Sequence, residues 1–466
     1  MKKTGLFKIL IFILMAIVVI TWFVPASYFD AGELVEYGSV YKLGFFDFFQ
    51  LIFGSFEFKY FLQIAFFILC VGAFYGVLAK TGKYRAWIEK IANSFKGIEY
   101  VFLICVAVVL AALSSVFSYG LLLFIFIPLL IGIILSMGYD KLTAFLTTFG
   151  AVLIGQLGST VGYNINGLLN DTIGTTLMSG LVYKLLLLFI PLGFLVFYII
   201  KAKHPGTKKA STKPEEESCG ELFIGEKIAN KYSVVPIIIT FVLLLILLVL
   251  GCTNWVESFG VTVFETFHNK VMGVSFLKDI LGSIGELGSW YYAEMCVILL
   301  LLSLIVGKLY RLKLREIIEN MFKGAGKLLP SAALIIMCYS VLYFAGNTFF
   351  YSTLAKYILG ATSKFNLFFS SVSMILGSVV HVDMAYLVAY AIPQIAAQDA
   401  NSTVLMLLCQ GMYGVTMFIA PTSVLLALGL SYLEIPYKEW IKKTWKYVLI
   451  VLAVVVAIIF AAMLIK

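Results

Sequence analysis

The sequence has 466 residues, of which 62% are hydrophobic and only 13% charged, and its mean hydropathy is +1.01. A soluble domain of this length would expose too much apolar surface, so the composition indicates a protein that crosses the membrane many times. The net charge of +9 does not indicate a nucleic-acid partner, because the basic residues lie between apolar runs, as they do when they set membrane topology.

Apolar runs long enough to cross a bilayer, which takes about 20 residues, recur along the whole chain. They lie at 7–25, 58–80, 142–169, 178–200, 234–253, 291–310, 328–350, 403–430 and 446–465. The first run follows Met1-Lys-Lys3 and is longer than the apolar part of a usual signal peptide. We therefore interpret it as a first span that is retained.

Two more apolar runs, 98–136 and 365–397, are interrupted near their centres by polar residues. The first contains Ser114-Ser-Val-Phe-Ser-Tyr-Gly120, and the second contains His381-Val-Asp383. We predict that each run forms a re-entrant hairpin that returns to its own side of the membrane. The alternative is a pair of short complete spans, which would give the same topology for the rest of the chain.

Two of the full-length runs also contain helix-breaking residues. The run 142–169 is interrupted at Gly155-Gln-Leu-Gly-Ser-Thr-Val-Gly-Tyr-Asn164, and the run 403–430 contains Gly411-Met-Tyr-Gly-Val-Thr-Met-Phe-Ile-Ala-Pro-Thr-Ser423. Such breaks free backbone polar groups, which are tolerated at membrane depth only where the backbone lines a cavity or is buried in protein. Paired interrupted segments in two halves are typical of secondary transporters that bind solute between the halves.

The sequence therefore predicts an all-α polytopic membrane protein with two inverted repeats, each with a re-entrant hairpin and an interrupted transmembrane helix, plus scaffold helices. We expect a first span and external interfacial segment at 1–57, transport repeat 1 at 58–200, a cytoplasmic linker at 201–231, scaffold helices at 232–327 and the inverted transport repeat 2 at 328–466. The polar linker lacks apolar periodicity, which indicates flexibility.

The two segments 26–57 and 254–290 mix aromatic with acidic residues and are expected to lie at the external membrane interface. If the first span leaves the cytoplasm, most of the 34 basic residues fall in cytoplasmic segments. The positive-inside rule thus predicts a cytoplasmic amino terminus and an external carboxyl terminus, in a plasma membrane or bacterial inner membrane.

Motifs for other chemistry are missing from the sequence. It contains no Gly-x-x-x-x-Gly-Lys loop for an ATP-driven pump and no His-Glu-x-x-His motif, and its histidines, His204, His268 and His381, are far apart. The seven cysteines form no Cys-x-x-Cys pair, so we expect neither a metal site nor a disulfide framework. No cofactor is expected, apart from Na⁺ or H⁺ as a coupling ion.

The interruptions supply the candidate ligands for a solute. Half-helix N-termini present free N–H groups that suit a carboxylate, whereas unwound carbonyls and helix C-termini suit a cation. For any single Ser or Thr of the interruptions, a hydroxyl that bonds back to its own helix is an equally good interpretation. The candidate solute ligands are Ser114, Ser115, Ser159, Thr160, Asn164, Ser378, Thr422 and Ser423.

Asp383 is the one acidic residue in the middle of a predicted membrane segment. A carboxylate there is costly and usually marks an ion or proton path. Low dielectric favours its protonated form, whereas a bound cation or a protonated His381 favours its charged form. The candidates for the coupling ion are Asp383, His381, Gly158 and Pro421. The alternative is an Asp383–His381 pair that only fixes the tip.

Several motifs resemble the anaerobic four-carbon dicarboxylate carrier family of the ion transporter superfamily. The most specific are Pro421-Thr-Ser423, at the end of Cys409-Gln-Gly-Met-Tyr-Gly-Val-Thr-Met-Phe-Ile-Ala-Pro-Thr-Ser423, and Ile435-Pro-Tyr-Lys-Glu-Trp440. Thr21-Trp-Phe-Val-Pro25 is similar too. The resemblance implies two inverted repeats with hairpins, a scaffold that often dimerises, and transport driven by a cation gradient or by exchange. Some members of this family are regarded as transporters of amino acids or short-chain carboxylates.

This sequence differs from the family at both hairpin tips. The first tip usually carries acidic residues but here is neutral, whereas the second is usually uncharged but here carries His381 and Asp383. We predict a secondary active transporter of a small carboxylate-bearing solute, such as a dicarboxylate, an amino acid or a short-chain carboxylate, in a lipid bilayer and as a possible homodimer. The alternative is a membrane-embedded enzyme or a channel with the same helical core.

Overall fold

The computed structural model describes residues 4–30, 33–36, 42–201, 223–225 and 232–464. Most of the predicted linker, 201–231, lies outside these residues. The described chain is helical except for one antiparallel pair of strands, β1 (Ser27–Asp30) and β2 (Glu33–Glu36), in which Ser27 faces Glu36. This strand pair lies in a segment for which the sequence predicted only an interfacial location.

The helices follow one another along the chain as two series with a similar order. The first series contains α1 (Thr4–Ile20), α2 (Phe45–Gly54), η1 (Ser55–Glu57), α3 (Lys59–Lys80), α4 (Lys83–Ser94), α5 (Glu99–Phe117), η2 (Gly120–Ile125), α6 (Ile127–Ser136), α7 (Lys141–Phe145), η3 (Leu146–Gly150), α8 (Ala151–Leu157), α9 (Tyr163–Ile173) and α10 (Leu181–Lys201). Between the series lie α12 (Val235–Cys252), α13 (Trp255–Phe259), α14 (Val263–Met272), α15 (Ser275–Leu281) and α16 (Tyr292–Leu309). The second series contains α17 (Leu314–Thr348), α18 (Phe350–Leu359), α19 (Leu367–Val380), α20 (Met384–Ala396), α21 (Ser402–Met417), α22 (Val424–Leu433) and α23 (Tyr437–Leu464).

Seven described helices are long and apolar enough to cross a membrane, namely α3, α5, α10, α12, α16, α17 and α23. The predicted class, an all-α polytopic membrane protein, is therefore confirmed. Two boundaries differ from the prediction. α17 begins at Leu314 and not near 328, because Glu316 accepts a hydrogen bond from the Lys313 N–H (2.8 Å) and so caps the helix. α23 likewise begins at Tyr437 and not near 446.

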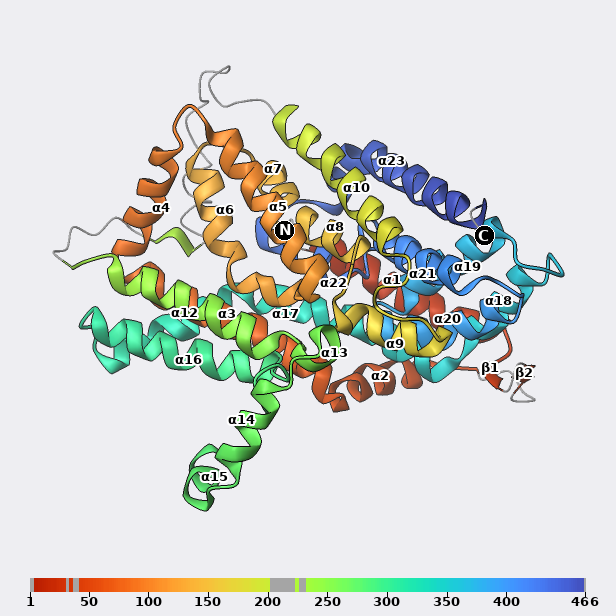
Figure 1. The fold of residues 1–466 in the computed structure, drawn as a ribbon, viewed down its shortest axis with the longest axis horizontal. Coiled ribbons are helices and arrows are strands. Elements are labelled where there is room, and N and C mark those ends of the chain that lie inside the picture. Colours follow the sequence, from red (N-terminus) through yellow and green to blue (C-terminus); the bar gives the residue numbers. More distant parts are fainter. Residues whose placement is uncertain (1–3, 31–32, 37–41, 202–222, 226–231, 465–466) are drawn as a thin grey trace.

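α3 and α17 form a close pair that joins the two series. A Cβ atom added to Gly324 of α17 would lie 2.1 Å from the carbonyl oxygen of Gly72 in α3, so the two backbones touch where only glycine fits. Small residues allow such close packing of membrane helices. α16 packs against the same pair, and α12 packs against α16 (Figure 1).

The hairpin of the second series consists of α19, a tip at residues 381–383, and α20. Its open end is closed by the Phe365 N–H, which donates to the Gln398 carbonyl (2.9 Å). α19 has 14 residues and is thus about 21 Å long, shorter than the roughly 30 Å of a bilayer core. These dimensions favour the re-entrant arrangement over two complete spans.

The hairpin of the first series consists of α5, a tip at residues 118–120, and η2 with α6. Glu99 at the start of α5 and Tyr139 just after α6 are near enough for the charge of Glu99 to act on Tyr139. The tip begins later than predicted. Ser114 and Ser115 belong to the last turns of α5, and Ser118, at φ 56°, ends that helix.

Both interrupted helices are broken inside the predicted segments, but α8 and α21 continue past the predicted starts of the interruptions, to Leu157 and Met417. The first break, residues 158–162, separates α7, η3 and α8 from α9, and the second break, residues 418–423, separates α21 from α22. Each hairpin tip lies against the break of its own series and hence against the middle of an interrupted helix. From α3 and from α17 onward the two series have a similar order of elements, whereas α1, α2 and η1 have no counterpart in the second series, and the inverted relation of the series stays a prediction.

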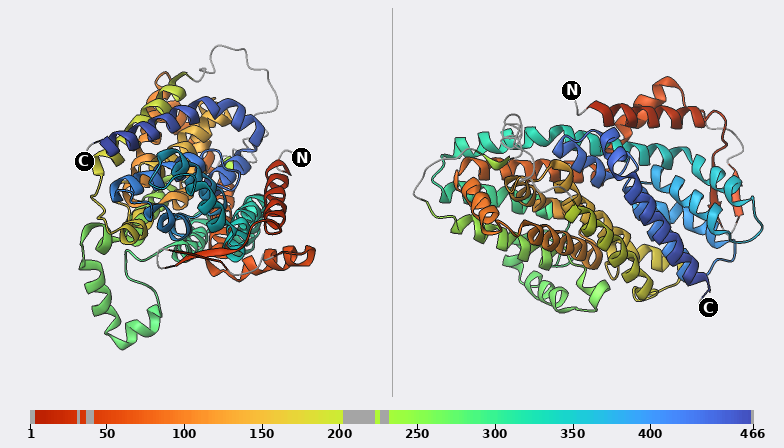
Figure 2. Two further views of the ribbon diagram at one scale, coloured as in Figure 1. Left: turned by 90° about the vertical axis from the view of Figure 1, so that its right-hand side faces the viewer. Right: turned by 90° about the horizontal axis from the view of Figure 1, so that it is seen from above.

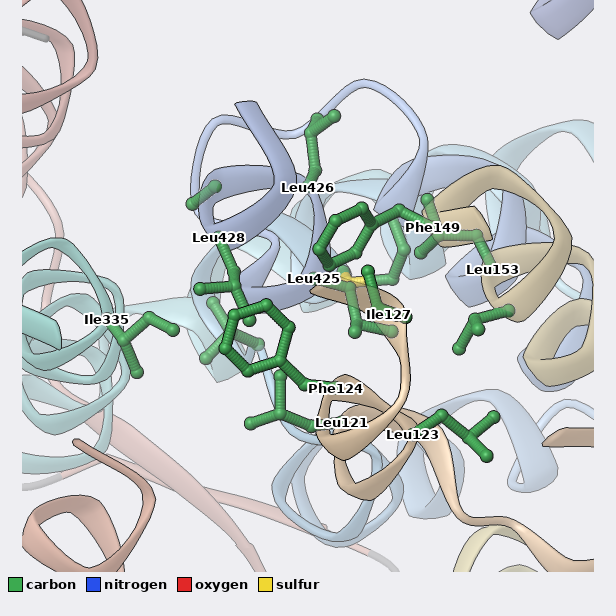
Figure 3. Packing of buried hydrophobic residues seen from close by; sticks show 14 of the residues in the cluster. Leu121, Leu123, Phe124, Ile127, Phe149, Leu153, Ile335, Leu425, Leu426 and Leu428 are labelled. Atoms are coloured by element: carbon green, nitrogen blue, oxygen red, sulfur yellow. The ribbon is translucent and has the colours of Figure 1, made fainter. Parts of the chain in front are cut away.

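The segment that follows the first tip is enclosed by both series. Figure 3 shows Leu121 and Phe124 of η2 packed near Phe149 of η3, Leu428 of α22 and Ile335 of α17. These side chains are almost completely buried. Apolar packing therefore holds the segment that follows the first tip in the interior. By contrast, α14 and α15 project from the rest of the molecule (Figure 1, Figure 2).

Candidate functional site

A cavity of about 140 Å³ lies where the two hairpin tips meet the two interrupted helices. The first tip contributes Ser118, Tyr119 and Gly120, and the second contributes Val382 and Asp383. The remaining lining residues are Leu121, Gln156 and Ile165 of the first series, Met384, Tyr413, Met417, Ser423, Val424 and Leu425 of the second, and Tyr60, Tyr291, Tyr292 and Tyr339 of α3, α16 and α17. Both hairpin tips and both interrupted helices, which the polar interruptions in the sequence predicted, thus line the cavity.

Asp383 is the N-cap of α20 and is half-buried at the wall of the cavity. One carboxylate oxygen accepts from the Ala385 N–H (3.0 Å), and the other accepts from the hydroxyl of Tyr60 (3.3 Å). Both partners are neutral donors. No Lys, Arg or His is among the described residues that line the cavity.

His381 is completely buried, and no hydrogen bond or ion pair joins its described side chain to Asp383. Its Nδ1 lies 3.2 Å from the Gly377 carbonyl oxygen, and its ring stacks on Tyr390 at 4.8 Å between centroids. Tyr351 meets the same ring edge-on. The alternative of a direct Asp383–His381 pair is therefore not what the structure has, because the described bonds of Asp383 go to Tyr60 and Ala385 and that of His381 goes to Gly377.

Tyrosine rings form the wall opposite the tips. Tyr60 is nearly parallel to Tyr291 at 6.5 Å between centroids and meets Tyr339 edge-on at 5.9 Å. Tyr292 lies against Tyr291 at 4.3 Å. Aromatic faces attract cations, and tyrosine hydroxyls can donate to anions, so this wall can contact either charge on a small solute.

The first break is held by polar side chains from three other helices. Ser115 of α5 donates to the Gly158 carbonyl (2.7 Å), and its own carbonyl accepts from the Thr160 N–H (3.0 Å). Gln410 of α21 donates to the carbonyls of Leu157 (3.0 Å) and Ser159 (2.8 Å).

The third helix at the first break is α10, whose Lys184 Nζ donates to the Thr160 carbonyl at 3.2 Å. Asn166 of α9 also contributes, because its Nδ2 donates to the Ser159 hydroxyl at 2.9 Å. Ser159 and Thr160 are thus buried ties between elements and not part of the cavity lining.

The second break is held by aromatic donors of α23. Trp440 Nε1 donates to the Phe418 carbonyl (2.9 Å), and the Tyr437 hydroxyl donates to the Ile419 carbonyl. Thr422 donates to the Val379 carbonyl (2.7 Å) and so ties the break to the second hairpin. The Pro-Tyr-Lys-Glu-Trp motif thus supplies hydrogen-bond donors to the carbonyls of this break.

Two of the predicted site residues, Asp383 and Ser423, line the cavity. Ser423 is the N-cap of α22, since its hydroxyl accepts from the Leu426 N–H (3.4 Å). The Ser378 hydroxyl donates to the Met374 carbonyl of its own helix (2.7 Å). For this residue the alternative of a hydroxyl that bonds back to its own helix therefore holds.

Five further candidates lie around the breaks or outside the cavity. Ser114 donates to the Val152 carbonyl (2.9 Å), and Pro421 accepts only a 4.0 Å contact from the Cys338 thiol. Gly158 lies in the first break and His381 inside the second hairpin. The Asn164 side chain lies outside the described residues. Binding roles for all of these residues stay predictions.

Sequence analysis missed Lys184, Gln410 and the tyrosine wall. Lys184 and Gln410 each interrupt an apolar run, so the reasoning that singled out Asp383 could have found them. No sequence signal marks Tyr60, Tyr291 and Tyr339, because they come from three helices that only the fold brings together.

Residues 4–464 match a family model described as C4-dicarboxylate anaerobic carrier. An uncharacterized protein of Haemophilus influenzae is 22% identical over 396 residues, which cover 82% of this chain and 71% of that protein. The crystal structure of the YdaH transporter of Alcanivorax borkumensis aligns with 98% of this chain and 97% of that one, at 15% identity and a TM-score of 0.44. That TM-score is too low for an argument from one fold to the other.

Proposed function

Because this chain belongs to the C4-dicarboxylate anaerobic carrier family, we propose that it is a secondary active transporter of a small carboxylate-bearing solute. A multi-pass membrane carrier, and not an enzyme, is what the family and the apolar helices support. The proposal adds that solute binds in the cavity between the two tips and that its movement is coupled to a cation gradient or to exchange.

The observation that carries the proposal is the cavity itself. It lies where both hairpins and both interrupted helices meet, as in transporters that open the same site to either side of the membrane. Ser423, Val424 and Leu425 place the N-terminus of α22 at its wall. The free N–H groups and positive dipole end of a helix N-terminus suit a carboxylate.

The charge of the lining favours one solute class. Asp383 is the charged group among the described lining residues, and no basic side chain faces it across the cavity. A dicarboxylate would therefore face a third carboxylate without a side-chain cation. An amino acid would direct its ammonium group to Asp383 and the tyrosine rings and its carboxylate to the start of α22.

A dicarboxylate, as in the family description, is the second candidate. It requires that Na⁺ or H⁺ neutralise Asp383 before or with the solute, because like charges repel in a site of low dielectric. The two candidate solutes, an amino acid and a dicarboxylate, differ in whether Na⁺ or H⁺ must bind at Asp383, so an experiment can distinguish them.

Matched solutes test the proposal. L-Aspartate and succinate differ by one ammonium group, and so do L-alanine and propionate. Any solute that binds the folded carrier raises its melting temperature by mass action. We expect the ammonium-bearing member of a pair to stabilise the purified protein more, in choline chloride as well as in NaCl. Stabilisation by succinate in NaCl alone would favour the second candidate, and no stabilisation by any of them would contradict a carboxylate solute.

The orientation and assembly are also proposed. Basic residues support a cytoplasmic amino terminus and an external carboxyl terminus, in a plasma or bacterial inner membrane. The exposed apolar side chains Phe267, Phe276 and Ile280 of α14 and α15 suit the membrane interface or a second copy of the chain. Labelling of single-cysteine variants from outside intact cells checks the orientation.

A further inference from the structure

Lys184 is a buried ammonium group at the first break. It lies in the first turn of α10, and its side chain is 0% exposed. Its Nζ donates to the carbonyls of Leu177 (2.9 Å) and Thr160 (3.2 Å). Among the described residues no carboxylate forms an ion pair with it. A buried charge without a counter-ion is costly, so the surroundings must compensate it.

Carbonyl dipoles supply that compensation. The helix Lys141–Leu157 ends at the break, and the C-terminus of a helix carries a partial negative charge. The unwound carbonyls that follow it include Thr160, which accepts from Lys184 directly. Unwound carbonyls together with a half-helix C-terminus are the ligands with which broken membrane helices hold a monovalent cation.

We propose that the Lys184 ammonium occupies the place of a monovalent cation at the first break and acts as a cation that the chain itself supplies. The first break then needs no dissolved Na⁺ to be stable. The second break contains no comparable ammonium, since its described donors Trp440 and Tyr437 are neutral. One consequence rests on the proposed transport function: an exchangeable coupling cation acts in the second series, near Asp383.

Two substitutions separate charge from space. Lys184→Ala removes the charge and leaves room for an ion, whereas Lys184→Met removes the charge but fills the space. We expect both variants to melt several degrees below the wild-type protein in choline chloride. NaCl at the same ionic strength should restore most of the loss in Lys184→Ala and little of it in Lys184→Met. Lys184→Arg keeps the charge and should show no added response to Na⁺.

Lys201→Ala is the matched control, because Lys201 is an exposed lysine at the other end of the same helix. It should respond to NaCl as the wild-type protein does. The proposal is overturned if Lys184→Ala is as stable as wild type in choline chloride, if NaCl restores neither variant, or if it restores both alike. Failure to obtain Lys184→Ala folded in either salt counts as no restoration. These melting temperatures do not depend on transport, so they stand even if the proposed function fails.

Discussion

The two breaks lie at corresponding places in the two series, yet different chemistry holds them. At the first break the donors are a lysine, a glutamine and a serine from α10, α21 and α5. At the second break the donors are the neutral aromatic side chains of Tyr437 and Trp440, both from α23. The first break is therefore tied to three other helices, with a lysine among its donors, whereas the second is tied mainly to the helix that follows it.

The hairpin tips show the opposite distribution of charge. The first tip, residues 118–120, is neutral, and the second carries Asp383 at the wall of the cavity. A basic side chain, Lys184, thus lies at the first break, and an acidic one, Asp383, at the second tip. If Lys184 takes the place of a cation as proposed, two similar helix breaks need not bind similar ions.

The largest effect is expected for Asp383→Asn, which keeps the shape of the side chain and removes its charge. Because Asp383 is proposed to contact the ammonium group of the solute, the variant should neither concentrate an ammonium-bearing solute in proteoliposomes nor exchange it at the wild-type rate. The measurement is uptake with and without an imposed Na⁺ or proton gradient.

Asp399→Asn is the control for that experiment, because Asp399 is exposed at the open end of the same hairpin. It should accumulate solute as the wild-type protein does. Wild-type accumulation and exchange by Asp383→Asn would contradict a role for Asp383 in transport.

A smaller effect is expected for Gln410→Leu, which cuts the tie between α21 and the first break. The carbonyls of Leu157 and Ser159 each lose a donor, and a buried group left without its partner costs about 1–3 kcal/mol. We expect a clear fall in melting temperature. Gln394→Leu is the control, since Gln394 bonds only to the Tyr390 carbonyl in its own helix. Equal stability of the two variants would show that the cross-molecule tie is unimportant.

The smallest effect is expected for Tyr437→Phe at the second break. The Ile419 carbonyl loses one neutral donor, which should lower stability by about 1 kcal/mol. Because no fixed charge is lost, NaCl should not restore this variant, in contrast to Lys184→Ala. If NaCl restored the stability of Tyr437→Phe, the two breaks would respond alike to Na⁺, which would contradict the proposed difference between them.

The sequence predicted the breaks and hairpins because Gly, Ser, Thr and Pro inside apolar runs are a local signal. It placed the first tip too early, since Ser114 and Ser115 keep helical geometry while their hydroxyls donate to Val152 and Gly158. A serine in a membrane helix does not by itself end the helix.

The partners of the breaks could not be predicted in the same way. Gln410 lies 253 positions beyond Leu157, and the tyrosine wall comes from three helices. Such contacts depend on how the helices pack and not on local residue pattern. The sequence therefore identified which backbone groups needed partners, whereas only the structure identified the partners.

The central claim is that Asp383 contacts the ammonium group of the solute in the cavity. The most direct test takes the matched pair that binds best, such as L-aspartate and succinate, and measures both dissociation constants for the wild-type protein and for Asp383→Asn. The account predicts that the wild-type preference for the ammonium-bearing solute falls by about tenfold or more, which corresponds to about 1.4 kcal/mol. An unchanged preference in Asp383→Asn would contradict it.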